Sequence, residues 1–67
     1  MKFEKGKNYR HSQIESFASQ NEYEYNEYGR EIVGEFAIGI TKDVGYGIAV
    51  TFIMVGLNTY ECVYSDH

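Results

Sequence analysis

The 67-residue sequence has no proline, no tryptophan and a single cysteine, Cys62. One cysteine cannot form a disulfide within the chain, which excludes a disulfide-stabilised scaffold and best fits a reducing, cytoplasmic setting. The two histidines, His11 and His67, belong to no Cys-x-x-Cys or His-x-x-x-His pattern, so we expect neither a metal site nor a cofactor. Without proline, no strand is forced to the edge of a sheet.

An excess of positive charge and a long hydrophobic segment are missing as well. Six lysines and arginines stand against ten aspartates and glutamates, for a formal net charge of -4, so direct nucleic-acid binding is not expected. The longest uncharged run, residues 44–60, includes glycine, threonine and asparagine and is shorter than the ~20 apolar residues of a membrane helix. The first residues lack the apolar core of a signal peptide. We expect a soluble cytoplasmic protein with one small domain, residues 1–67.

Residues 12–20 carry the signals of a helix. Ser12 and Glu15 have the spacing of a capping box, in which each side chain accepts a hydrogen bond from the other residue's backbone N–H. Apolar residues follow at helical spacing: Ile14, Phe17 and Ala18. The helix is expected to end near Asn21, a residue that tolerates the left-handed conformation found at helix ends.

Alternation of residue types predicts strands in much of the remaining chain. Residues 22–25 form a strand or an extended entry, and residues 26–29 have the composition of a turn. A short strand is also expected before the helix. Three further strands are predicted, separated by turns near residues 42–47 and 58–59: residues 30–41, 48–57 and 60–64.

This order predicts an α+β domain with one short helix packed on a three- to four-stranded antiparallel sheet. One helix covers one face of such a sheet, yet the strand over residues 48–57 is apolar on both faces. Its second face would stay exposed: Ile53, Val55 and Leu57. Exposed apolar patches mark interaction surfaces, and burying one such side chain stabilises a contact by roughly 1.5–3 kcal/mol. We therefore expect homo-oligomerisation through these three residues to complete the fold.

The sequence predicts no catalytic residues. A nucleophile needs a base beside it, and nothing in the spacing brings Cys62 to a histidine, so we interpret it as a small buried hydrophobic residue. Glu22, Glu24 and Glu27 are typical of a solvated polar face, because no apolar pocket flanks them. The segment Gly45–Gly47 resembles part of a phosphate-binding loop, but a strand follows it instead of a helix, which favours a hairpin turn.

Tyrosine is abundant, with seven copies in an aromatic content of 16%. Its ring stacks and its hydroxyl forms hydrogen bonds, so it suits binding surfaces. An aromatic ring for a base and a basic side chain for a phosphate are the minimum for a nucleotide-like ligand. The candidate ligand-binding residues are Arg30 and Lys42 for the phosphates, with Tyr28, Tyr46 and Tyr60 for stacking. Cross-strand tyrosine pairs at the margin of the sheet are the alternative interpretation.

In size, acidity and cysteine content the chain resembles small accessory proteins encoded by phages, a loose group without a shared motif. Some of these block CRISPR or restriction enzymes, and others sequester cyclic-nucleotide and ADP-ribose-type immune signals between subunits. The resemblance implies a non-enzymatic homo-oligomer that sequesters a small anionic, nucleotide-like signalling ligand at subunit interfaces. The alternative is an anti-defence inhibitor that binds a protein partner through the acidic, tyrosine-rich residues 22–28. A third hypothesis is a structural or regulatory subunit without a ligand.

Overall fold

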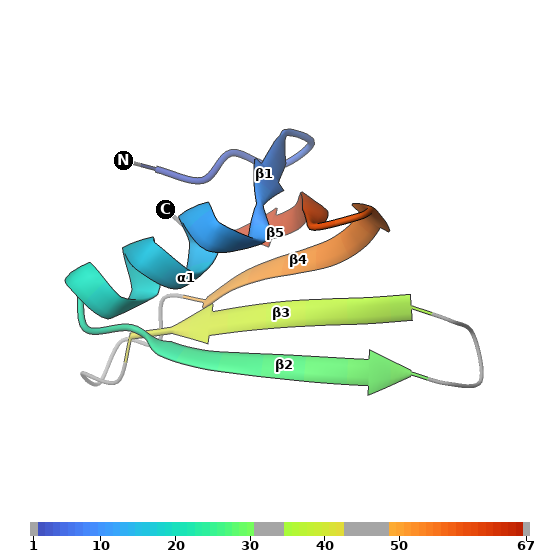
Figure 1. The fold of residues 1–67 in the computed structure, drawn as a ribbon. Coiled ribbons are helices and arrows are strands. Elements are labelled where there is room, and N and C mark those ends of the chain that lie inside the picture. Colours follow the sequence, from blue (N-terminus) through green and yellow to red (C-terminus); the bar gives the residue numbers. More distant parts are fainter. Residues whose placement is uncertain (1, 31–34, 43–48, 67) are drawn as a thin grey trace.

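The structure is a computed structural model that describes residues 2–30, 35–42 and 49–66. In these ranges it has one helix and five strands, in the order β1 (Asn8–Arg10), α1 (His11–Gln20), β2 (Glu24–Arg30), β3 (Glu35–Thr41), β4 (Ala49–Gly56) and β5 (Thr59–Ser65). The strands form one antiparallel sheet in the order β1-β5-β4-β3-β2, which places the first strand beside the last (Figure 1). The predicted α+β class is confirmed, and the described sheet has five strands where three or four were predicted.

The turn predicted over residues 26–29 is wrong, because these residues lie inside β2. All seven residues of β2 pair with β3 in one regular register, from Glu24 opposite Thr41 to Arg30 opposite Glu35. Pairing with a neighbouring strand therefore overrides the turn preference of asparagine and glycine. Of the strand predicted over residues 30–41, Glu35–Thr41 forms β3, whereas Arg30 belongs to β2 and residues 31–34 lie outside the described residues. The turn predicted near residues 42–47 lies largely outside the described residues.

The helix starts one residue earlier than predicted. Arg10 is the N-cap, and its backbone N–H donates to Gln13 Oε1 at 2.9 Å. Ser12 consequently lies within the helix, and the predicted capping box of Ser12 and Glu15 is wrong. Sequence spacing alone did not distinguish these two starts, because the β1–β5 pairing determines where the extended backbone ends.

The C-terminus of α1 lies at Asn21, as predicted, but the left-handed residue is the next one. Glu22 has a φ of 59°, and the backbone N–H of Tyr23 donates to the Ala18 carbonyl at 2.8 Å. The Phe17 and Tyr23 rings pack with their centroids 5.2 Å apart. This is the Schellman arrangement, in which a hydrophobic contact accompanies the hydrogen bond that closes the helix.

The hydrophobic core lies between α1 and one face of the sheet. The helix contributes Ile14 and Ala18, and the sheet contributes alternate residues of β3, β4 and β5: Ile38, Ile40, Val50, Phe52, Tyr60 and Cys62. The interpretation of Cys62 as a buried residue is confirmed. Within the described ranges, no helix has the length and hydrophobicity needed to span a membrane.

The N-terminal segment completes this core with Phe3, which is 1% exposed. Its ring makes edge-to-face contacts with three others, at centroid distances of 4.8 to 5.0 Å: Tyr9, Phe17 and Phe52. Backbone hydrogen bonds from Gly6 N–H to the Cys62 carbonyl (2.8 Å) and from Cys62 N–H to the Lys7 carbonyl (2.9 Å) fasten the segment to β5. The Ser65 hydroxyl also donates to the Phe3 carbonyl at 2.7 Å.

The other face of the sheet, here called the uncovered face, carries no helix or further strand in the described part of the chain (Figure 1). The strand registers place on it Tyr28, Ala37, Gly39, Thr51, Ile53 and Tyr64, together with the polar residues Glu24, Asn26, Thr41 and Glu61. Tyr28 is 55% exposed and Tyr64 is 52% exposed. Of the predicted interface residues, Ile53 lies on this face, Val55 lies at a register shift between Met54 and Gly56, and Leu57 lies in the β4–β5 turn. Homo-oligomerisation through them stays a prediction.

Candidate functional site

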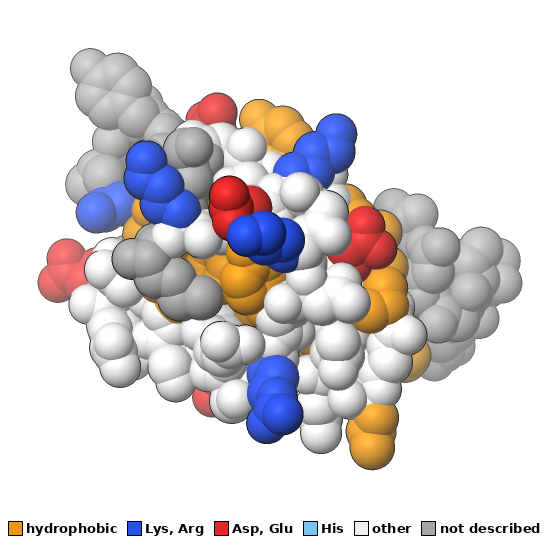
Figure 2. Space-filling model, turned by 90° about the horizontal axis from the view of Figure 1, so that it is seen from above, with side chains coloured by type: hydrophobic (Ala, Val, Ile, Leu, Met, Phe, Trp, Pro, Cys, Tyr) orange, Lys and Arg blue, Asp and Glu red, His pale blue; other side chains and the backbone are white. Residues whose placement is uncertain are grey.

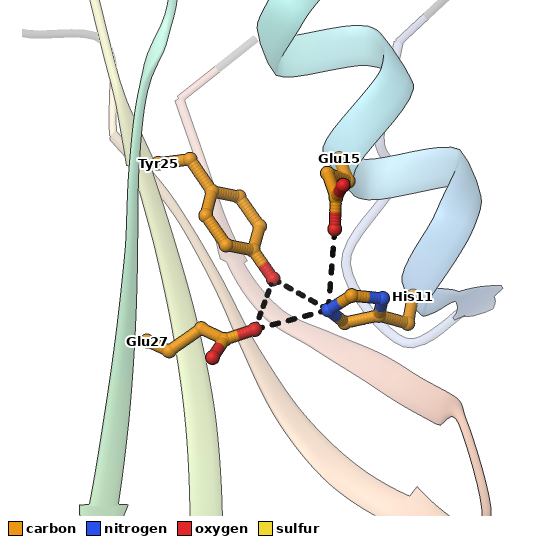
Figure 3. A network of polar contacts seen from close by, with 4 residues as sticks. All are labelled: His11, Glu15, Tyr25 and Glu27. Atoms are coloured by element: carbon orange, nitrogen blue, oxygen red, sulfur yellow. Dashed lines mark hydrogen bonds and ion pairs between the residues drawn. The ribbon is translucent and has the colours of Figure 1, made fainter.

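A polar network joins the start of α1 to the middle of β2 (Figure 3). His11 Nε2 lies 2.7 Å from the Tyr25 hydroxyl and 3.0 Å from Glu27 Oε1. The Tyr25 hydroxyl donates to the same Glu27 oxygen at 2.6 Å, and Glu15 Oε2 is 3.6 Å from His11 Nε2. The spacing explains the convergence, because residues four apart share a helix face and residues two apart share a face of a strand.

These contacts fix which atoms carry protons. Tyr25 donates its only hydroxyl proton to Glu27, so at the contact with His11 its oxygen accepts. Nε2 of His11 therefore carries a proton, which points towards the Tyr25 and Glu27 oxygens. The network is a set of donors that converge on one carboxylate.

The pKa shifts agree with this arrangement. Hydrogen bonds from Tyr25 and then from His11 lower the pKa of Glu27 below its ordinary value. Burial raises the pKa of Tyr25, and the adjacent Glu27 raises it further. Near neutral pH, Glu27 is thus ionised and Tyr25 keeps its proton. A tyrosine held in its protonated form is a hydrogen-bond donor and a poor nucleophile.

An open cleft of about 570 Å³ lies beside the network, between α1 and β2, and its described lining is Glu15, Ala18, Ser19, Tyr23, Tyr25 and Glu27. Two carboxylates and two tyrosine rings give it an acidic, aromatic character, with no basic residue in this lining. Lys42 lies nearby, with Nζ 5.6 Å from the centroid of the Tyr23 ring. The electrostatics of the cleft suit a cationic group better than a phosphate.

The predicted ligand-binding residues are dispersed. Tyr28 lies on the uncovered face, whereas Tyr60 is 6% exposed and belongs to the core on the opposite face. Lys42 follows β3 and contacts Tyr23. Arg30 is the last residue of β2, and Tyr46 lies outside the described residues. The structure thus separates Tyr28 from Tyr60, and binding of a ligand by this set stays a prediction.

Charges of both signs are intermingled on the side of the molecule seen from above (Figure 2). Lys7 and Glu4 form an exposed ion pair, so part of the basic N-terminal segment is neutralised by its own neighbour. In the described ranges, no group of three or more histidine, cysteine, aspartate or glutamate residues is placed to hold a metal ion. Cys62 is buried, and burial raises the pKa of its thiol.

Sequence reasoning missed the polar network. The four-residue spacing of His11 and Glu15 was visible, but β2 was interpreted as an entry followed by a turn. That interpretation separated Tyr25 from Glu27 and left Glu27 as a solvated carboxylate. Reading residues 24–30 as one strand would have placed Tyr25 and Glu27 on one face, although their meeting with His11 depends on how α1 crosses the sheet.

Comparisons with protein-family models, with curated proteins and with solved structures find no match to this chain. Its function is therefore inferred from its own residues and their arrangement.

Proposed function

We propose that this protein is a non-enzymatic binding protein that acts as a homo-oligomer, in which the uncovered face of one copy packs on that of another. The observation that carries the proposal is that α1 covers one face of the sheet, whereas no described element covers the other. On this uncovered face, Tyr28 and Tyr64 are more than half exposed. Large exposed apolar patches on small proteins mark interaction surfaces.

The size of this face is close to that of a specific contact. Four strands of seven or eight residues and the three-residue β1, at about 3.3 by 4.8 Å per residue, cover roughly 500 Å². Two such faces would bury roughly 1,000 Å², which is about the area expected of a small specific interface. A second copy is the favoured occupant, because a chain of 67 residues has a small core and gains stability from self-association.

Binding is favoured over catalysis by the state of the Tyr25 hydroxyl and the Cys62 thiol. Burial raises the pKa of both the Tyr25 hydroxyl and the Cys62 thiol. Cys62 is also fully buried, and its thiol donates to the Tyr64 carbonyl at 3.5 Å. Groups kept protonated in this way serve packing and hydrogen bonding.

The ligand in this proposal is a small anionic, nucleotide-like molecule bound where two copies meet. Tyr28 supports it, because an exposed ring on the uncovered face would lie at the contact between subunits. Arg30, two residues later in β2, would supply positive charge. Calorimetric titration with cyclic dinucleotides and ADP-ribose derivatives should give heat of binding that Tyr28→Ala or Arg30→Ala abolishes. No heat with any of these compounds would refute this part of the proposal.

A second function, inhibition of a protein partner, is favoured by one observation. The acidic, tyrosine-rich segment folds into β2, a strand at the edge of the sheet, where a partner can add a strand of its own. Reversal of charge at Glu22, Glu24 and Glu27 would abolish such binding, whereas Arg30→Ala would leave it nearly unchanged.

Light scattering after size-exclusion chromatography tests the homo-oligomer. At micromolar concentration the wild type should have the mass of a dimer or a larger assembly, and Tyr64→Glu should lower that mass by placing a charge on the uncovered face. Phe36→Glu is the matched control: Phe36 is 49% exposed but shares a strand face with the buried Ile38. A monomeric wild type, or an equal effect of both substitutions, would overturn the proposal.

A further inference from the structure

We propose that β2 forms a second self-association surface, distinct from the uncovered face. The β2 strands of two copies pair edge to edge in antiparallel fashion, with Glu24 of each copy opposite Arg30 of the other. The continuous sheet of such a pair has ten strands, twice the five described in one copy.

The edge of β2 is available for this pairing. β2 is the last strand in the sheet order, and no described element lies beyond it (Figure 1). Its inner side pairs with β3 along all seven residues. In a strand at a sheet edge, the outward N–H and carbonyl groups are unpaired and act as a template for another strand.

β2 lacks several of the features that protect edge strands, although three of its seven residues are charged: Glu24, Glu27 and Arg30. Protected edge strands are usually very short, interrupted by a bulge, or marked by proline or by charged side chains, above all lysine. The opposite edge strand, β1, has three residues, and the β4–β5 pairing has two register shifts. β2 has seven residues with no proline or lysine, and its pairing with β3 has no register shift.

The sequence of β2 is complementary to itself in one register. Antiparallel pairing centred on Glu27 places Glu24 opposite Arg30 at both ends of the contact. Between them, Tyr25 faces Gly29 and Asn26 faces Tyr28. Opposite charges directly across two strands are favourable. Shifting the centre by one residue in either direction removes both Glu24–Arg30 pairs.

The polar network reduces the one charge repulsion that would oppose this register, which is between the two copies of Glu27. At its centre, Glu27 of one copy faces Glu27 of the other. Each carboxylate is turned over the sheet towards His11 (Figure 3), where Nε2 lies 3.0 Å away and the Tyr25 hydroxyl donates at 2.6 Å. These contacts direct the two carboxylates away from each other and give each one its own donors, which reduces their repulsion.

The helix leaves room for the second copy. The cleft between α1 and β2 is open to solvent, and no described strand lies beyond the outer edge of β2. In the pair, the two clefts would lie on the same side of the joined sheet, across the two-fold axis. This two-fold axis is perpendicular to the sheet, whereas the two-fold axis of face-to-face packing lies in the plane of the sheet. Because the two axes are perpendicular, the two contacts together are compatible with a closed tetramer.

Reversal and exchange of charge test the pairing register. In a Tyr64→Glu background, which disables the uncovered face, sedimentation equilibrium at low salt should still show a dimer. Glu24→Arg or Arg30→Glu alone puts like charges at both ends and should raise the dimer dissociation constant about ten- to thirtyfold. The double exchange Glu24→Arg with Arg30→Glu puts opposite charges back at both ends and should return the dissociation constant to its value in the Tyr64→Glu background. Glu61→Arg, on the interior strand β5, is the control and should have no effect.

Several results would overturn this inference. A monomer in the Tyr64→Glu background would contradict the β2 pairing but not the face-to-face contact. A double exchange that fails to restore the dimer would also contradict the β2 pairing. Hydrogen exchange of the wild-type backbone gives a test without substitutions: protection of β2 amides should increase with protein concentration. Exchange in β2 that does not depend on concentration contradicts the pairing, whether the copies stay single or β2 serves another protein.

Discussion

The ring of Tyr28 lies over Gly39, across the β2–β3 pairing on the uncovered face. A Cβ atom at residue 39 would lie 3.3 Å from Tyr28 Cε2, closer than an ordinary van der Waals contact. Tyr28 is 55% exposed, so its ring can move aside for a small group. The absence of a side chain at residue 39 therefore allows the Tyr28 ring to lie close to the β3 backbone.

Substitutions at Gly39 should reveal this contact. Gly39→Ala should change the free energy of unfolding by less than about 1 kcal/mol, because the strand's preference for alanine offsets the displacement of the ring. Gly39→Val should destabilise by about 1–3 kcal/mol through overpacking. Urea unfolding measures both changes. In a Tyr28→Ala background the cost of Gly39→Val should largely disappear, and an undiminished cost would show that the ring is not its cause.

Phe3 should be the most costly truncation in the N-terminal segment. Phe3→Ala removes a ring that contacts three other aromatic rings in the core, at a cost of about 3–5 kcal/mol. A domain of this size has a total stability of roughly 3–10 kcal/mol, so circular dichroism should show a variant that is partly or wholly unfolded. Phe36→Ala, at an exposed ring, should stay within about 1 kcal/mol of the wild type.

Glu22 offers a stabilising substitution. Its φ of 59° places a side chain in the left-handed region, which costs an ordinary residue roughly 1–2 kcal/mol. Glu22→Gly should therefore raise the free energy of unfolding by about 0.5–1 kcal/mol, after allowance for the greater freedom of glycine in the unfolded chain. Glu24→Gly, within β2, should lower it by a similar amount. Thermal unfolding that ranks the two variants in the opposite order would contradict the assignment of the helix end.

Glu27 should make stability depend on pH in the acid range. Its pKa in the folded protein lies below its ordinary value of 4.5, so its contribution is complete above about pH 5.5 and is lost as the pH falls through the folded-state pKa. Glu27→Gln should cost no more than about 1 kcal/mol at neutral pH, since the carboxylate is exposed and screened. The difference between wild type and variant, from urea midpoints, should shrink in acid. A constant difference from neutral to strongly acidic pH would contradict this.

Local patterns predicted α1, β4 and β5 well, because each of these elements is encoded by its own residues. The helix needed only apolar spacing and an end signal at Asn21. β2 was misread because Asn26 and Gly29 favour turns in isolation, and only their pairing with Gly39 and Phe36 of β3 makes them part of a strand. The α+β class thus follows from the sequence, whereas the extent of β2 depends on tertiary contacts.

The polar network was less predictable than the core. His11, Tyr25 and Glu27 are separated by fourteen and two residues, and they meet because α1 begins beside β2. Burial of Cys62 could be predicted from its chemical character alone. The dispersal of Tyr28 and Tyr60 follows from the strand registers: Tyr28 lies opposite Ala37 on the uncovered face, and Tyr60 lies opposite Met54 on the core face.

The pairing of β1 with β5 also bears on how the chain acquires its structure. The first strand finds its only described neighbour some fifty residues later, as Tyr9 lies opposite Tyr60. During synthesis, Phe3 and β1 must wait until β5 has left the ribosomal tunnel before they have a surface to dock on. Closing so long a loop slows folding, so the aromatic N-terminal segment of the nascent chain stays accessible to chaperones until β5 has emerged.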